Sequence, residues 1–145
     1  MRVFRLMRCF VALVMLATGV AGCAGSATSP SQTPAFSQID LRIGDGAPAA
    51  GVAALTVNYT GWLYDPSKAD QKGAQFDANP VGTPFAFTLG AGAVIKGWDQ
   101  GVPGMLVGGV RRLVIPPSLA YGANRNSLIP PNATLVFDIE LVSVQ

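Results

Sequence analysis

The sequence contains no histidine and 2 cysteines, and 12% of its 145 residues are charged. Without histidine, a Ser–His–Asp or Cys–His catalytic arrangement is excluded, as is a metal site that histidines ligate. The acidic residues are scattered along the chain, with no cluster that would hold Ca²⁺ or Mg²⁺. The glycine-rich stretch 89–97 (LGAGAVIKG) matches neither the dinucleotide-binding fingerprint nor the Walker pattern. We therefore expect neither a metal ion nor a cofactor.

Hydrophobic residues are concentrated in residues 1–22, which contribute much of the high mean hydropathy of +0.38. Arg2, Arg5 and Arg8 precede an apolar run over 9–17 (CFVALVMLA). This run is too short to span a hydrocarbon core of ~30 Å, so the pattern predicts a secretory signal peptide over 1–22. The alternative is a buried N-terminal helix. Without the three arginines the net charge changes from +2 to −1, so we expect no nucleic-acid partner.

The end of this leader resembles the bacterial lipobox, whose cysteine is lipidated and becomes the first mature residue. Residues 20–23 read VAGC, so we expect a lipid on Cys23; ordinary cleavage after a small residue is the alternative. Cys9 lies inside the leader, so the mature chain has no partner for a disulfide. After the cysteine, residues 24–35 contain only Ala, Gly, Ser, Thr, Pro and Gln, a composition that predicts a flexible tether over 23–35.

These features together predict export across the cytoplasmic membrane. The protein would be attached to a membrane through Cys23 and would face the periplasm or the cell exterior. In a cell with an outer membrane, that membrane is the expected one, because Ala24 replaces the Asp associated with inner-membrane retention in enteric bacteria.

Residues 36–145 alternate apolar and polar side chains with a period of two. The alternating segments are 39–43, 55–61, 85–89, 110–115 and 135–141. This pattern is typical of an antiparallel sheet with one face on a core. Helical spacing occurs at Ile95, Trp98 and Val102, shortly before Pro103. We predict one α+β domain over 36–145, with about five strands and one short helix on the apolar face of the sheet.

Six aromatic residues lie beside the predicted turns: Tyr59, Phe76, Phe85, Trp98, Tyr121 and Phe137. Each one taken alone is more simply a core residue. Taken together, they suit an apolar pocket with a few polar groups at its edge.

Six runs of this domain resemble the FKBP-type peptidyl-prolyl cis-trans isomerase family. They are VNYTGWL (57–63), QFDAN (75–79), TPFAFTLGAGAVIKGWDQGVPGM (83–105), VGG (107–109), RRLVIPPSLAYG (111–122) and IPPNATLVFDIELV (129–142). The resemblance covers 39–145 and implies an antiparallel sheet curled around one short helix. It also implies rotation of the peptide bond before proline without a cofactor. Many members of the family bind macrolides such as tacrolimus and rapamycin.

The resemblance implies an apolar pocket with Trp98 as its floor, on which the proline ring rests. The residues that match the walls of this pocket are Tyr59, Phe85, Val94, Ile95 and Phe137. Ile129 matches a loop residue that flanks the pocket mouth, so the resemblance predicts contact with the substrate there.

The resemblance also assigns polar roles in catalysis to Tyr59, Asp77 and Tyr121. Phe76 and Asp77 match a Phe-Asp pair in which the ring packs the substrate and the carboxylate borders the twisting amide. The hydroxyl of Tyr121 and the backbone N–H of Ile95 match donors to a carbonyl of the substrate or ligand.

Two segments at the pocket rim depart from the family pattern, and both are about one residue short. Residues 78–83 (ANPVGT) lack an arginine often found there, so we expect Asp77 to lose a partner. Residues 122–128 (GANRNSL) carry Arg125 where small residues are usual. Both departures bear on substrate preference and drug affinity, whereas the long insert over 65–75 resembles bacterial members.

The chemistry of prolyl isomerisation agrees with these absences. Rotation about a peptide bond costs ~18–20 kcal/mol because twisting removes amide resonance, and no bond of the chain is broken. Neither a nucleophile nor a metal is needed, and an apolar site favours the less dipolar twisted amide. The sequence therefore predicts a monomeric isomerase that acts on proline-containing polypeptides during extracytoplasmic folding. The alternative is a binding module of the same fold, such as a chaperone-like holdase or an anchored adaptor.

Overall fold

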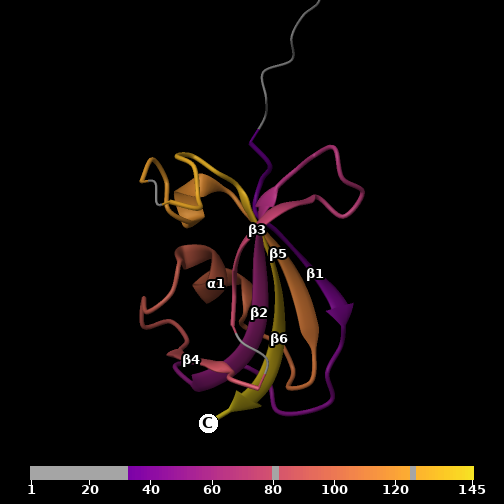
Figure 1. Ribbon diagram of the computed structural model, residues 1–145. Coiled ribbons are helices and arrows are strands. Elements are labelled where there is room, and N and C mark those ends of the chain that lie inside the picture. Colours follow the sequence, from indigo (N-terminus) through magenta and orange to yellow (C-terminus); the bar gives the residue numbers. More distant parts are fainter. Residues whose placement is uncertain (1–32, 80–81, 125–126) are drawn as a thin grey trace, which may run out of the picture. The chain divides into compact units, whose positions relative to one another are not determined.

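Six antiparallel strands form one sheet in the computed structural model, which describes residues 33–79, 82–124 and 127–145. They are β1 (Ser37–Arg42), β2 (Ala54–Tyr64), β3 (Lys72–Ala78), β4 (Phe85–Thr88), β5 (Val110–Ile115) and β6 (Leu135–Val144). The order across the sheet is β1-β5-β6-β2-β3, and β4 pairs with β2 (Figure 1). A helix, α1 (Lys96–Gly101), and a 3₁₀ turn, η1 (Pro117–Leu119), complete the elements.

The α+β prediction is confirmed, because every segment with period-two alternation contains a strand. Strand β3 was not predicted, because it lies partly in the long insert, where apolar residues do not alternate. The predicted signal peptide (1–22) and Cys23 lie outside the described residues, as does most of the predicted tether (23–35). Within the described part of the chain, no helix is long and apolar enough to cross a membrane.

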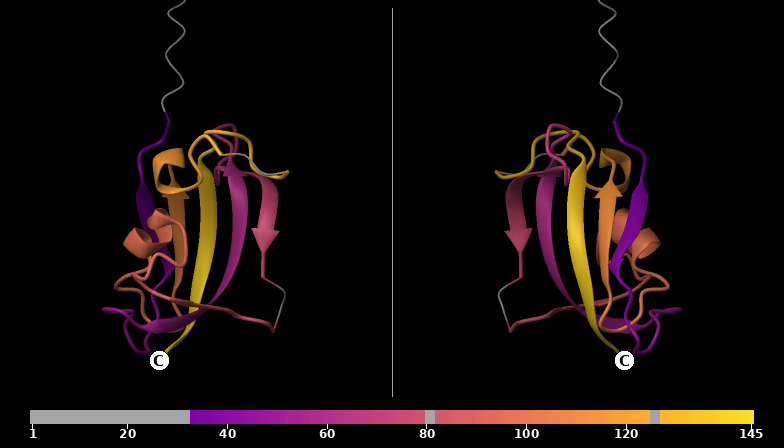
Figure 2. Two further views of the ribbon diagram at one scale, coloured as in Figure 1. Left: turned by 90° about the vertical axis from the view of Figure 1, so that its left-hand side faces the viewer. Right: turned by 90° about the vertical axis from the view of Figure 1, so that its right-hand side faces the viewer.

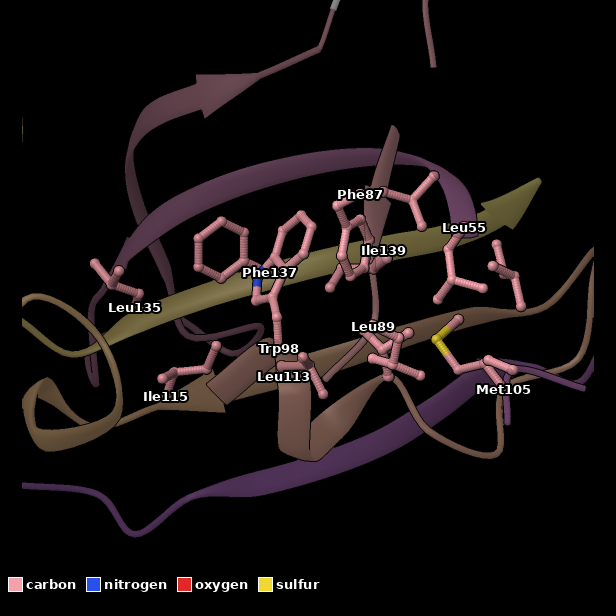
Figure 3. Packing of buried hydrophobic residues seen from close by; sticks show 14 of the residues in the cluster. Leu55, Phe87, Leu89, Trp98, Met105, Leu113, Ile115, Leu135, Phe137 and Ile139 are labelled. Carbon is pink, nitrogen blue, oxygen red and sulfur yellow. The ribbon is translucent and has the colours of Figure 1, made fainter. Parts of the chain in front are cut away.

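The alternating residues of the central strands bury one face of the sheet. On β6, the residues that face the core are Leu135, Phe137, Ile139 and Leu141, and each is at most 3% exposed. Helix α1 lies against this face (Figure 2), with Trp98 directed into the core (Figure 3). A Cβ atom on Gly97 would lie 2.4 Å from Cγ2 of Ile115, so the helix approaches β5 closely only because this residue is glycine. The core therefore sits between α1 and the sheet.

The apolar residues of the first predicted strand do not join this core. Strand β1 forms at the sheet edge beside β5, but Ile39, Leu41 and Ile43 are all exposed to solvent. Its alternation was therefore correctly assigned to a strand, whereas the expectation that its apolar side faces the core was wrong.

The side of β1 that faces the helix carries a charged pair. Nε and Nη2 of the buried Arg111 donate to the two carboxylate oxygens of Asp40, at 2.5 and 3.1 Å. Nη1 of Arg111 donates to the carbonyl oxygens of Gly101 and Pro103, at 2.8 and 3.0 Å. Arg111 thus ties β1 to the end of α1 with hydrogen bonds rather than apolar packing, because a buried guanidinium needs partners for its donors.

Candidate active site

A pocket with a volume of about 210 Å³ opens where helix α1 faces the sheet. It is lined by residues from β2, β3, β4, β6, α1 and the loops before α1 and after η1. These residues are Tyr59, Asp77, Phe85, Ala93, Val94, Ile95, Trp98, Tyr121 and Phe137. The pocket is therefore largely aromatic and aliphatic, with polar groups on a few side chains.

Trp98 forms the floor of the pocket and is 4% exposed. Its ring meets Tyr59, Phe137 and Phe87 edge to face, with centroid distances of 5.1, 5.4 and 5.6 Å. Among buried side-chain polar atoms of the described residues, Nε1 of Trp98 has no hydrogen-bond partner. Edge-to-face contacts between aromatic rings are favourable, and three of them together hold the indole in one orientation.

Phe76 does not line the pocket but packs against Phe137, which does. Its ring meets Phe137 edge to face at 5.5 Å. A Cβ atom on Gly61 would lie 2.7 Å from a ring carbon of Phe137 and 2.8 Å from one of Phe76. The absence of a side chain at Gly61 therefore allows these two rings to meet on the surface of β2.

Tyr59 and Asp77 are joined at the polar edge of the pocket. The hydroxyl of Tyr59 donates to Oδ2 of Asp77 at 2.9 Å. Burial, together with this hydrogen bond and the charge of Asp77, raises the pKa of Tyr59 to about 12. No described residue forms an ion pair with Asp77. The hydrogen bond from the hydroxyl of Tyr59 therefore fixes the position of the exposed carboxylate of Asp77.

The hydrogen-bond donors at the pocket that have no acceptor among the described residues include the hydroxyl of Tyr121 and the backbone N–H of Ile95. Ile95 is the N-cap of α1, with an extended backbone (φ −62°, ψ 148°). Tyr121 is 43% exposed, and burial followed by the charge of Asp77 raises its pKa. The hydroxyl of Tyr121 therefore keeps its proton at neutral pH. Both it and the N–H of Ile95 are available to a carbonyl oxygen.

The structure brings together eight of the ten residues that the sequence assigns to this pocket. They are Tyr59, Asp77, Phe85, Val94, Ile95, Trp98, Tyr121 and Phe137. Phe76 and Ile129 are not among the lining residues: Phe76 packs against Phe137, and Ile129 is 4% exposed and belongs to the core cluster. Ala93 lines the pocket but was not predicted, because a small residue after a glycine-rich turn carries no signal of its own. The roles of these residues in binding or catalysis stay predictions.

The part of the chain that the structure describes contains no group of three or more Cys, Asp or Glu residues that would hold a metal ion. The polar groups of the pocket include one carboxylate, two tyrosine hydroxyls, the indole N–H of Trp98 and the backbone N–H of Ile95. Such a set suits hydrogen bonding to a ligand, and neither tyrosine hydroxyl has a lowered pKa that would make it a nucleophile.

Comparison with known proteins agrees with this geometry. The family model for FKBP-type peptidyl-prolyl cis-trans isomerases matches residues 45–142. Over 106 residues, or 73% of the chain, it is 47% identical to FK506-binding protein 4 of Neurospora crassa and 48% identical to a peptidyl-prolyl cis-trans isomerase of Saccharomyces cerevisiae. The crystal structure of a peptidyl-prolyl cis-trans isomerase from Pseudomonas syringae pv. tomato superposes with a TM-score of 0.63 at 35% identity, covering 76% of this chain and 75% of that one.

The chain therefore belongs to the FKBP-type peptidyl-prolyl cis-trans isomerase family. The matches cover 21% of the Neurospora protein and 24% of the yeast protein, so the chain corresponds to about a quarter or less of these curated relatives.

Proposed function

We propose that this protein is a peptidyl-prolyl cis-trans isomerase that acts on proline-containing polypeptides. The observation that carries the proposal is the pocket itself: an apolar floor at Trp98, beside donors on Ile95 and Tyr121 that have no acceptor in the described part of the chain. A proline ring suits the floor, and the carbonyl oxygens on either side of that ring need such donors. Membership of the isomerase family supports the same activity.

The proposed mechanism requires no covalent chemistry. With the proline ring on Trp98 and between Phe85 and Phe137, the Xaa-Pro bond loses its contact with water. The twisted amide is less dipolar than the planar one, so this apolar surrounding costs the transition state less than the ground state. A carbonyl held by Tyr121 or Ile95 stays in place while the bond rotates. Each 1.4 kcal/mol gained in the transition state relative to the ground state accelerates rotation tenfold.

An isomerisation assay on a short Xaa-Pro peptide tests this proposal. We expect the wild-type protein to accelerate cis–trans exchange, and a proline-free pocket ligand to inhibit it. The alternative function is a chaperone-like holdase or an adaptor of the same fold, which would bind the peptide without changing its exchange rate. Binding with no acceleration would favour that alternative.

We propose that macrolides such as tacrolimus and rapamycin bind the same pocket. The pocket has aromatic walls and donors for ligand carbonyls, and its volume of about 210 Å³ suits an apolar part of such a macrolide rather than the whole ring. Such a compound should compete with the proline peptide. Isomerase activity that persists at a saturating macrolide concentration would place the ligand elsewhere.

We propose that the protein is a bacterial lipoprotein attached to a membrane at Cys23 and facing the periplasm or the cell exterior. The support is the sequence VAGC at 20–23 after a basic and apolar leader. One acyl chain binds membranes weakly and two or more anchor stably. Intact-mass analysis of the native protein should find an acylated Cys23 at the N-terminus, and Cys23→Ser should abolish the membrane fraction. A mature chain that begins elsewhere would contradict this.

We propose that the protein acts as a monomer. The proposed mechanism needs the floor at Trp98 and the donors on Ile95 and Tyr121, so it requires no residue of a second copy. Light scattering at the concentrations used for the activity assay should give the mass of one chain.

A further inference from the structure

Asn79 occupies a gap between two strands that share one edge of β2. Strand β3 pairs with β2 from Thr60 onward, and β4 pairs with it up to Val57. In the gap, the backbone N–H of Asn79 donates to the carbonyl oxygen of Tyr59 at 3.3 Å. A regular antiparallel pair would return the bond from the N–H of Tyr59 to the carbonyl of Asn79. Here that N–H donates to the side-chain Oδ1 of Asn79 instead, at 2.6 Å.

The amide side chain thus takes the place of the backbone carbonyl where the chain leaves the sheet. Its Nδ2 donates to the carbonyl oxygen of Thr83 at 2.9 Å, just before β4. Nδ2 also donates to Oδ1 of Asn58 at 3.1 Å. An asparagine amide offers two N–H donors and one carbonyl acceptor, and all three are engaged here. Asn79 therefore joins the end of β3, the edge of β2 and the approach to β4.

The residues held by Asn79 carry the polar edge of the pocket. Tyr59 is bound through its backbone, and Asp77 lies two residues before Asn79 at the end of β3, paired with Gly61. Asp77 is exposed and has no ion pair in the described part of the chain, so its carboxylate depends on this strand end and on the bond from Tyr59. A small displacement of either backbone would lengthen the 2.9 Å bond between them.

We propose that Asn79 is a positioning residue that sets the hydroxyl of Tyr59 against the carboxylate of Asp77 and thereby aims both groups at the bound proline peptide. This proposal rests on the proposed isomerase function. In this proposal the amide of Asn79 braces the end of β3, beside Asp77, through its hydrogen bonds to Tyr59, Asn58 and Thr83.

The test compares Asn79→Ala with a matched variant at another turn. Oδ1 of Asp65 accepts hydrogen bonds from the N–H and Oγ of Ser67, at 3.0 and 2.6 Å, in a turn between β2 and β3 that does not line the pocket. Asp65→Ala therefore also removes a side-chain brace. For each variant, kcat and KM are measured with a proline peptide, and the titration of Tyr59 is followed by NMR of ¹³C-labelled tyrosine, with Tyr59→Phe for assignment.

For Asn79→Ala we expect kcat to fall about two- to tenfold with KM little changed, because the lost positioning acts on the twisting amide. We also expect Tyr59 to titrate at lower pH than in the wild type, because its bond to Asp77 weakens. Asp65→Ala should leave both readouts at wild-type values. Asn79→Ala that folds with wild-type kcat and an unchanged Tyr59 titration would overturn the proposal.

Asn79→Asp decides the question if Asn79→Ala fails to fold. It has the same size and keeps the acceptor for Tyr59, but it turns a carboxylate oxygen toward the carbonyl of Thr83. We expect the same fall in kcat in this variant, and a wild-type kcat would again overturn the proposal. Its added negative charge raises the pKa of Tyr59 by itself, so the titration of Tyr59 is compared only between wild type and Asn79→Ala. If the wild-type protein shows no isomerase activity, the proposed function fails, whereas the titration of Tyr59 still tests the role of Asn79.

Discussion

The indole of Trp98 is at once part of the core and the surface on which we place the proline ring. It is 4% exposed and contacts Tyr59 and Phe137 at about the distances expected for aromatic pairs. A substitution here acts on both stability and binding, so the two effects must be measured separately.

Trp98→Leu should weaken macrolide and peptide binding at least tenfold while the fold is retained. Leucine keeps the site apolar, but it loses the flat face and the aromatic contacts, each worth about 0.5–1.5 kcal/mol. Calorimetric titration of the variant, with thermal unfolding alongside, measures both effects. Trp62→Leu is the matched control, because Trp62 lies under Lys72 at 3.9 Å and does not line the pocket. Unchanged affinity in Trp98→Leu would place the ligand elsewhere.

Tyr121→Phe should lower kcat/KM by about two- to tenfold, as the loss of one hydrogen bond of roughly 0.5–1.5 kcal/mol predicts. The hydroxyl has no acceptor among the described residues, so its removal leaves no described partner unsatisfied. Tyr64→Phe, at the end of β2 and outside the pocket, should leave kcat/KM unchanged. Complete loss of activity in Tyr121→Phe would mean that the hydroxyl does more than hold a carbonyl.

At the scale of elements, the period-two pattern located the strands well, and it failed where charge replaced apolar packing. On β6, the buried face is apolar at every second residue, so the pattern predicted both the strand and its orientation. On β1, Asp40 lies on the same side as the buried Arg111, which donates hydrogen bonds to its carboxylate, while Ile39 and Leu41 face solvent. The sequence pattern of β1 alone does not show that the buried Arg111 of β5 lies opposite Asp40.

The position of helix α1 depends on a close approach that the hydrophobic pattern does not indicate. Gly97→Ala would place a methyl group 2.4 Å from Ile115, so the helix or β5 must move. We expect a loss of about 1–3 kcal/mol in the free energy of unfolding, as is usual for overpacking, and weaker peptide binding, because α1 carries Trp98. Gln100→Ala, on the exposed side of the same helix, should change neither. Urea denaturation and peptide titration provide the two measurements.

At the scale of the whole molecule, ion pairs join elements on the side of the sheet away from the pocket. Arg112 donates to both carboxylate oxygens of Asp138 at 2.7 and 2.9 Å, and Lys72 donates to the same carboxylate at 2.6 Å. Burial alone would raise the pKa of Asp138, but the hydrogen bonds from Arg112 and Lys72 outweigh it and hold the pKa below its usual value. The carboxylate thereby links β3, β5 and β6.

This lowered pKa predicts acid sensitivity. The stabilisation from Asp138 is present above its usual pKa of 3.8 and is lost as the pH falls below that value, through the pKa in the folded protein. Asp138→Asn should be less stable than wild type by about 1.5–3 kcal/mol at pH 7, and this difference should shrink below pH about 4. Asp45→Asn, at a carboxylate without an ion pair to a described residue, is the control. Denaturation at several pH values measures the difference in the free energy of unfolding between Asp138→Asn and wild type. A difference that does not change with pH would contradict the lowered pKa of Asp138.

The sequence located most of the pocket because the motifs that line it keep their order and spacing over the whole domain. It did not indicate that Ile129 is buried, since an apolar residue beside prolines fits a rim and a core position equally well. The brace at Asn79 was not predicted either. It requires β3 and β4 to share one edge of β2, a pairing between segments that are adjacent in the sheet only after folding.

The central claim is that a pocket without a titrating acid–base pair accelerates rotation about the Xaa-Pro bond. Tyr59 has a pKa of about 12 and the pKa of Tyr121 is also raised, so both keep their protons near neutrality, and the chain has no histidine. The most direct measurement is kcat/KM for a proline peptide between pH 6 and pH 8.5, in an assay without a coupling protease and with Asp77→Asn beside the wild type. We predict a nearly flat profile for both proteins, with a lower but measurable rate in the variant. A bell-shaped or steep profile near neutrality, or no activity in Asp77→Asn, would contradict the account.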